Sequence, residues 1–146
     1  MNKIFLEKIA IFDIDIVVCV GSKLEDWEKW MKKVKFSESF LKDYKYIRPQ
    51  IQEGFKILHE ANNGCMACIK NEEGVNYYFL LLKKWEYSSQ CYDTLLHEIV
   101  HLKQFLWEAK AIEKEIEFEA YFIENVFIQL RDKLNKLFIC QKKNKK

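Results

Sequence analysis

The sequence predicts an α+β fold in which a small sheet of three to four strands packs against a central helix and a long C-terminal helix. Three observations support this prediction. A β-branched run lies near the start of the chain, two strand-like runs joined by a short polar loop lie in its middle, and apolar residues recur at helical spacing in its last third. The chain has 146 residues, 49% of them hydrophobic, which is enough for one packed core. We therefore expect a single domain over residues 1–140.

The first predicted element is a long strand from Ile9 to Val20, which ends at Gly21. Ser22 is the expected N-cap of a helix over Leu24–Lys33. One face of this helix would hold the residues at helical spacing, which are Trp27, Trp30, Met31 and Val34. Residues 35–50 mix aromatic and charged side chains with the only proline, so irregular or short helical structure is expected there.

The middle of the chain predicts a brief helix followed by a β-hairpin. The helix would cover Ile51–His59 and end at the turn formed by Asn62–Gly64. Strands are expected over Cys65–Lys70 and Val75–Leu82. The loop between them, Asn71–Gly74, has a length and a composition that suit a hairpin.

Two helices are expected in the C-terminal half. Asp93 and Thr94 form a good N-cap for a helix over Leu95–Trp107. A long helix should span Ala111–Phe138, because apolar residues recur there every three or four positions. The basic segment 141–146 that follows is expected to be a disordered, solvated tail.

Composition excludes several classes of partner. A formal charge of +2 indicates neither nucleic acid nor an acidic membrane surface, and no uninterrupted apolar run approaches the roughly 18 residues of a membrane span. The five cysteines form an odd number without a recognisable secretory signal, which favours reduced thiols and a cytoplasmic protein. Cys65 and Cys68 have C-x-x-C spacing, but they lie in a strand-like pattern without a second such pair, so we expect packed thiols.

The strongest chemical signal is the sequence His97-Glu98-Ile99-Val100-His101. On a helix, residues four apart share a face, so the two imidazoles can converge on one ion. Glu98 is rotated by about 100° from His97, which places its carboxylate beside the metal as a base. Zn²⁺ suits this pattern, since two neutral ligands leave it Lewis acidic and it lowers the pKa of a bound water. We therefore expect His97 and His101 as zinc ligands and Glu98 as the catalytic base.

A catalytic zinc site takes a third protein ligand, and the segment Glu113–Tyr121 downstream of the motif offers four carboxylates for it. Helical periodicity places Glu119 near the centre of the apolar stripe of the last helix and Glu117 towards the opposite side, so burial alone favours Glu119. The remaining histidine, His59, is expected on a partly exposed helix upstream and is the less favoured candidate.

Two segments, Asp93–Gln104 with its HExxH sequence and Glu117–Tyr121 with the form E-x-x-A-Y, resemble the gluzincin class of metallopeptidases. They are most similar to small predicted metallopeptidases of phages and bacterial mobile elements, and the resemblance implies a minimal zincin-like fold. It also implies Glu117 as the third ligand, with Glu119 as the alternative. Tyr121, which stands where many gluzincins carry an acidic residue, would orient a ligand or stabilise the reacting oxyanion; Tyr92 and Tyr87 are further candidates for the latter role.

In related folds the strand before the motif helix forms an edge along which a peptide pairs. The resemblance therefore implies that Val75–Leu82 is a substrate-binding edge, whereas its apolar character fits an interior strand equally well.

The leading functional expectation is a zinc metallopeptidase that hydrolyses a peptide or protein substrate with a zinc-bound water activated by Glu98. The alternative is a zincin-like module that binds zinc and a partner protein without proteolysis. A purely structural zinc is less favoured, because such a site has no use for a base beside it. The sequence does not indicate the substrate or the oligomeric state.

Overall fold

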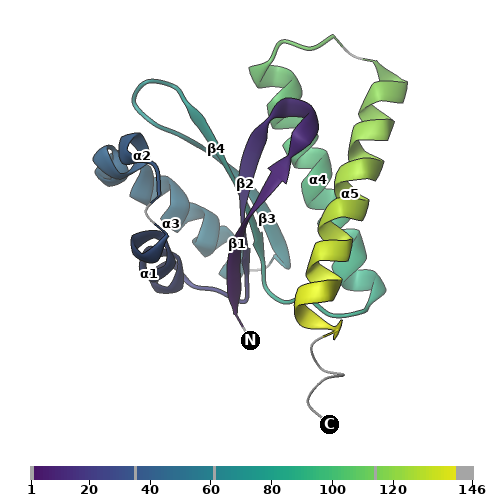
Figure 1. Ribbon diagram of the computed structural model, residues 1–146, viewed down its shortest axis with the longest axis horizontal. Coiled ribbons are helices and arrows are strands. Elements are labelled where there is room, and N and C mark those ends of the chain that lie inside the picture. Colours follow the sequence, from purple (N-terminus) through teal and green to yellow (C-terminus); the bar gives the residue numbers. More distant parts are fainter. Residues whose placement is uncertain (1, 35, 61, 114, 141–146) are drawn as a thin grey trace. The chain divides into compact units, whose positions relative to one another are not determined.

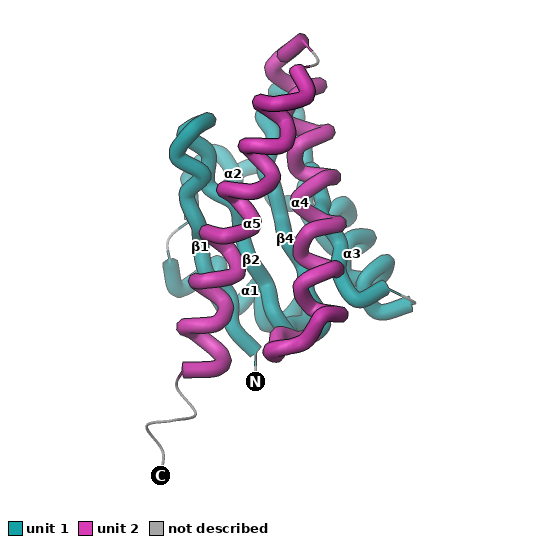
Figure 2. The backbone as a smooth tube through the Cα atoms, turned by 90° about the vertical axis from the view of Figure 1, so that its right-hand side faces the viewer, with its two compact units in different colours: residues 1–83 teal, residues 84–146 magenta. Residues whose placement is uncertain are grey.

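A computed structural model describes residues 2–34, 36–60, 62–113 and 115–140, so the predicted tail 141–146 lies outside the described residues. The predicted α+β class is confirmed: the described residues form a four-stranded mixed sheet and five α-helices (Figure 1). The strand order is β1-β2-β4-β3. The chain divides into two compact units, Met1–Lys83 and Lys84–Lys146, which Figure 2 shows in different colours. The first unit holds the sheet and the second holds the motif helix.

The prediction of one long strand from Ile9 to Val20 is wrong. Two antiparallel strands, β1 (Lys3–Ile9) and β2 (Ile14–Val20), stand in its place, joined by a 3-10 turn at Ala10–Phe12. The chain reverses at Asp13, which takes the left-handed conformation with φ of 49°. Aspartate is one of the few residues that tolerates this conformation, because its short side chain can bond locally.

Helix α1 (Leu24–Lys33) is confirmed, but Ser22 is not its N-cap. The cap residue is Lys23, whose backbone N–H donates to the carboxylate of Asp26 at 2.9 Å. The hydroxyl of Ser22 donates instead to a carbonyl of β2. Val34, expected on the buried face, follows the end of the helix and is largely exposed.

Residues 35–50 were expected to be irregular or short helical, and their described part holds one short helix and the first turns of a longer one, which extends the predicted helix Ile51–His59. Helix α2 covers Glu38–Lys42 and is capped by the Ser37 hydroxyl, while α3 covers Tyr44–Glu60 and includes Pro49. A proline inside a helix removes one hydrogen bond and crowds the preceding turn. The apolar face of α3 outweighs this cost, because four of its side chains at helical spacing are buried: Ile47, Ile51, Phe55 and Leu58.

The predicted hairpin is confirmed as β3 (Gly64–Lys70) and β4 (Asn76–Leu82). Gly74 in the connecting loop has a φ of +81°, which favours glycine. Strand β4 pairs with β3 on one side and runs parallel to β2 on the other, so it is an interior strand. The expectation that Val75–Leu82 forms a peptide-binding edge is therefore wrong, and its apolar run reflects burial in the middle of the sheet.

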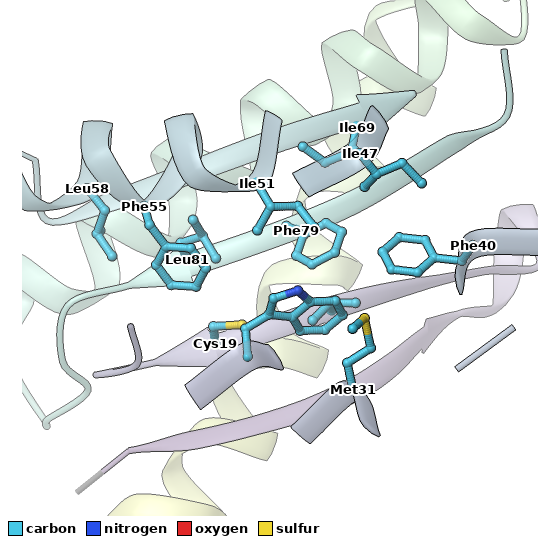
Figure 3. Close-up of a cluster of buried hydrophobic side chains, with 12 residues drawn as sticks. Cys19, Met31, Phe40, Ile47, Ile51, Phe55, Leu58, Ile69, Phe79 and Leu81 are labelled. Carbon is cyan, nitrogen blue, oxygen red and sulfur yellow. The ribbon is translucent and has the colours of Figure 1, made fainter. Parts of the chain in front are cut away.

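The core of the first unit lies between the sheet and helices α1, α2 and α3 (Figure 3). Trp27 is fully buried and its ring makes edge contacts with Phe79 at 4.9 Å and Phe40 at 6.0 Å between centroids. Such edge-to-face packing suits the charge distribution of aromatic rings. These contacts join α1, α2 and the central strand β4 into one apolar cluster.

One side chain of α3 bonds the outer edge of the sheet. The amide of Gln50 donates to the carbonyl of Lys70 at 2.8 Å and accepts from its backbone N–H at 3.1 Å. Lys70 is the last residue of β3, which is an edge strand. The side chain thus satisfies one backbone donor and one acceptor that a further strand would otherwise pair.

The second unit consists mainly of two helices, α4 (Ser89–Ala109) and α5 (Ile116–Phe138). Helix α4 begins six residues before the predicted start, because the hydroxyl of Ser88, not Asp93 or Thr94, caps it by accepting from the backbone N–H of Cys91. Helix α5 begins later than predicted.

The delay at the start of α5 has a local cause. Ala111 takes the left-handed conformation, with φ of 48°, and two backbone N–H groups, those of Ala111 and Ile112, donate to carbonyls in the last turn of α4. These bonds end α4 and prevent one continuous helical path into α5.

The two helices pack antiparallel. Trp107 near the end of α4 contacts Phe118 and Phe122 near the start of α5. At the other end, Asn135 accepts from the Trp85 indole at 2.9 Å and donates to the Tyr92 hydroxyl at 3.2 Å. No helix among the described residues has the length and apolar character needed to cross a bilayer.

Candidate metal centre

The predicted motif residues lie in the middle of helix α4, as expected. His97, His101 and Gln104 succeed one another at spacings of four and three residues, which places them on one face of the helix. Glu98 is rotated towards the buried face, whose members include Leu95 and Ile99. The helix therefore presents the two imidazoles on one face and the Glu98 carboxylate beside them, at the edge of its buried face.

The two imidazoles converge through the same ring atom. Nε2 of His101 lies 3.1 Å from Nε2 of His97, and the two rings are nearly perpendicular, with centroids 4.7 Å apart. Two nitrogens that each bind Zn²⁺ at the usual length, in tetrahedral geometry, stand about 3.3 Å apart. The spacing of these two donors thus fits a shared zinc ion without a change of helix geometry.

Gln104 holds the His101 ring from the other side. Its Oε1 lies 3.1 Å from Nδ1 of His101. A carbonyl oxygen only accepts hydrogen bonds, so this contact favours the tautomer of His101 that has its proton on Nδ1 and its lone pair on Nε2. That is the protonation state in which His101 can bind a metal through the nitrogen that faces His97.

The three motif residues differ in burial. His97 is exposed and His101 is half-buried. Glu98 is the buried member of the motif, at 5% exposure. A carboxylate in that position is shielded from bulk water on most sides, which suits a base that acts at one defined point.

Helix α5 packs on the side of α4 that lies away from the histidines. Its residues meet Tyr92, Lys103 and Trp107 of α4, which stand roughly 120° to 180° around the helix from His101. One of these contacts involves a predicted ligand. Nζ of Lys103 lies 3.2 Å from Oε1 of Glu119, and the two side chains are only 16% and 14% exposed.

This ion pair explains the position of Glu119. Periodicity placed its side chain near the apolar stripe, and the structure confirms that it is largely buried. Its partner there is a lysine, as a buried carboxylate requires a donor or a cation. Because the Glu119 carboxylate is paired with Lys103, it lies on the far side of α4 from the imidazoles.

Glu117 and Tyr121 lie on the outer face of α5. They are four residues apart and therefore share a face of the helix, and Tyr121 is 60% exposed. Glu117 stands in the first turn of the helix and is exposed. Within the described part of the chain, no group of three or more His, Cys, Asp or Glu side chains is arranged to hold one ion.

The other tyrosines considered for the oxyanion differ in their surroundings. The hydroxyl of Tyr92 accepts from Asn135, and its ring stacks on Trp85 at 5.5 Å. Tyr92 therefore serves the packing of α4 against α5. Tyr87, at 79% exposure, meets Tyr92 edge-on. His59, the less favoured ligand candidate, is exposed on α3 and stacks on Phe55.

Two residues of the site have no role in the prediction from sequence. Gln104 contacts the imidazole ring of His101, and Lys103 forms an ion pair with Glu119. The helical spacing of Gln104 from His101 could have indicated the first contact. The second depends on how α5 packs against α4 and has no local signal.

The comparisons with protein-family models, with curated proteins and with solved structures found no match to this chain.

Proposed function

We propose that the protein is a zinc metallopeptidase that hydrolyses peptide bonds at the HExxH face of α4. The observation that carries the proposal is the convergence of the His97 and His101 Nε2 atoms at 3.1 Å, with Glu98 buried next to them in the sequence. When bound, zinc supplies Lewis acidity at the substrate carbonyl and lowers the pKa of water.

The chain's own residues then have defined tasks. Glu98 accepts a proton from the water that attacks the carbonyl carbon, and it returns that proton to the amine as the C–N bond breaks. His97 and His101 stay neutral and act only as ligands through Nε2. Tyr121 is the proposed donor to the oxyanion, on the resemblance of the E-x-x-A-Y sequence.

Glu117 is the proposed third ligand. Two considerations support it: the E-x-x-A-Y resemblance, in which the first glutamate is the ligand, and the engagement of Glu119 by Lys103. We further propose that the protein acts in the cytoplasm, where its thiols stay reduced. Cys65 and Cys68 are three residues apart on β3, so they point to opposite faces of the sheet and do not form a joint site.

The proposal is tested by zinc content and cleavage of a broad peptide library in four proteins: wild type, Glu98→Gln, His97→Ala and His59→Ala. Wild type should hold one zinc per chain and cleave peptides. Glu98→Gln should keep the metal and lose activity by about 10²-fold or more, because only the base is removed. His97→Ala should lose both, and His59→Ala, a matched loss of an exposed histidine, should lose neither.

The outcomes separate the alternatives. Wild type that stays well below one zinc per chain after loading would refute the metal site itself. Stoichiometric zinc without cleavage of any peptide would overturn the peptidase and favour the zinc-binding interaction module. Equal activity in wild type and Glu98→Gln would remove Glu98 from the reaction.

A further inference from the structure

We propose that Gln104 is a positioning residue that prepares His101 for zinc before the metal arrives. This inference rests on the proposed function, because it concerns the same site, but it assigns a role to a residue outside the HExxH sequence. The juxtaposition that carries it is the contact of Gln104 Oε1 with His101 Nδ1 at 3.1 Å, opposite the Nε2 atom that faces His97.

The protonation of the imidazole pair determines whether it can bind zinc. A neutral imidazole carries its single proton on Nδ1 or on Nε2, and only the unprotonated nitrogen has a lone pair for a metal. Without a partner at Nδ1, the His101 proton would be free to lie on Nε2, and zinc binding would first require its transfer. The Gln104 carbonyl favours the proton on Nδ1 and so keeps the Nε2 lone pair available.

Orientation is the second effect. His101 is half-buried on α4, and its ring would otherwise turn about its χ2 bond. The hydrogen bond to Gln104, one turn further along the same helix, fixes the ring plane so that Nε2 points at the ring of His97. Since the glutamine and both histidines belong to one rigid helix, this arrangement forms without any contribution from α5.

The contribution should be visible in zinc affinity. Partners that orient a ligand histidine typically alter metal affinity by about 10- to 100-fold when they are removed. Gln104→Met retains a side chain of similar length and removes the acceptor, so it should weaken zinc binding within that range. Gln104→Glu keeps an acceptor at the same place and should restore binding to the wild-type level or above it.

The test uses the whole chain and two readouts. Zinc affinity is measured by competition with a chelator in wild type, Gln104→Met, Gln104→Glu and the control Gln90→Met, which removes an exposed glutamine from the first turn of the same helix. The position of the His101 proton is measured in the metal-free protein from imidazole ¹⁵N shifts, about two pH units above the ordinary histidine pKa.

The expected result is a proton on Nδ1 of His101 in wild type and in Gln104→Glu, and a shift towards Nε2 in Gln104→Met together with the loss of affinity. Wild type with its proton on Nε2 would overturn the inference. So would a Gln104→Met protein that binds zinc as tightly as Gln90→Met, or a Gln104→Glu protein as weak as Gln104→Met. If neither wild type nor any variant binds zinc, the peptidase proposal fails. The ¹⁵N shifts then still show whether Gln104 holds the His101 proton on Nδ1.

Discussion

The ion pair between Lys103 and Glu119 predicts that the two glutamates of the E-x-x-A-Y sequence have different roles, Glu119 in stability and Glu117 in metal binding. Glu119→Gln removes the charge that neutralises Lys103, and Lys103→Met leaves the carboxylate in a site where it is only 14% exposed. Glu117 has no such burial, since it is exposed in the first turn of α5. Substitution of Glu119 should therefore lower the free energy of unfolding and leave zinc affinity unchanged, whereas substitution of Glu117 should have the reverse effects.

The magnitude follows from the geometry. A charged hydrogen bond at 3.2 Å between side chains that are about one-seventh exposed should contribute about 2 kcal/mol to the free energy of unfolding. Either single substitution should cost about that much. Replacing both residues, as Lys103→Met with Glu119→Leu, should recover part of it, with a coupling of about 1–2 kcal/mol. Glu117→Gln should stay within about 0.5 kcal/mol of wild type.

The assay is urea unfolding followed by tryptophan fluorescence, with a chelator present so that bound metal does not add to the free energy of unfolding. Zinc affinity is measured separately. Glu117→Gln should weaken zinc binding by about 100-fold or more, and Glu119→Gln should leave it near wild type. Loss of zinc in Glu119→Gln with retention in Glu117→Gln would show that our assignment of the third ligand is reversed. A Glu119→Gln protein as stable as wild type would refute the reasoning about the ion pair.

Three further substitutions test the fold of the two units. Asn135→Ala removes the partner of the Trp85 indole and the Tyr92 hydroxyl and should cost about 2 kcal/mol in urea unfolding, whereas an unchanged midpoint would show that these bonds contribute nothing. Burial, and then a hydrogen bond to a glutamate of α1, raises the pKa of Tyr44 from 10.0 to about 12, so the folded state favours the neutral hydroxyl. This stabilisation is complete below pH 10 and is lost as the pH rises towards 12. Tyr44→Phe should therefore reduce the dependence of the urea midpoint on pH in that window. An identical pH dependence of the midpoint in wild type and Tyr44→Phe would contradict the raised pKa of Tyr44. Gly74→Ala meets no neighbouring atom but must adopt a φ of +81°, so a loss of about 1 kcal/mol in thermal or urea unfolding is expected, and a gain would show that the loop relaxes.

The parts of the fold that local patterns determine were predictable. The hairpin around Gly74 has a polar turn between two strand-like runs, and the motif helix has apolar residues at helical spacing on both sides of His97. The reversal at Asp13 lacked such a signal. Residues Ala10–Phe12 are apolar and contain neither glycine nor proline, so the sequence reads as one continuous strand although the chain turns back on itself.

The candidate site was predictable to a similar extent. The placement of His97, Glu98 and His101 follows from helix geometry alone, because all three lie on one element. The placement of Glu117 and Glu119 depends on which side of α4 receives α5, and this is determined by aromatic contacts and the Lys103 ion pair between residues far apart in the chain. Periodicity correctly indicated that Glu119 is buried, but it could not distinguish a metal from a lysine as its partner.

The two hydrogen bonds between Gln50 and Lys70 bear on how the protein behaves at high concentration. An exposed strand edge is a template on which a second chain can add by backbone pairing, which leads to self-association. The side-chain amide of Gln50 has the same donor and acceptor as a peptide group and occupies the pairing position at the end of β3. Helix α3 therefore contributes more than its apolar face: it protects one edge of the sheet against intermolecular strand addition.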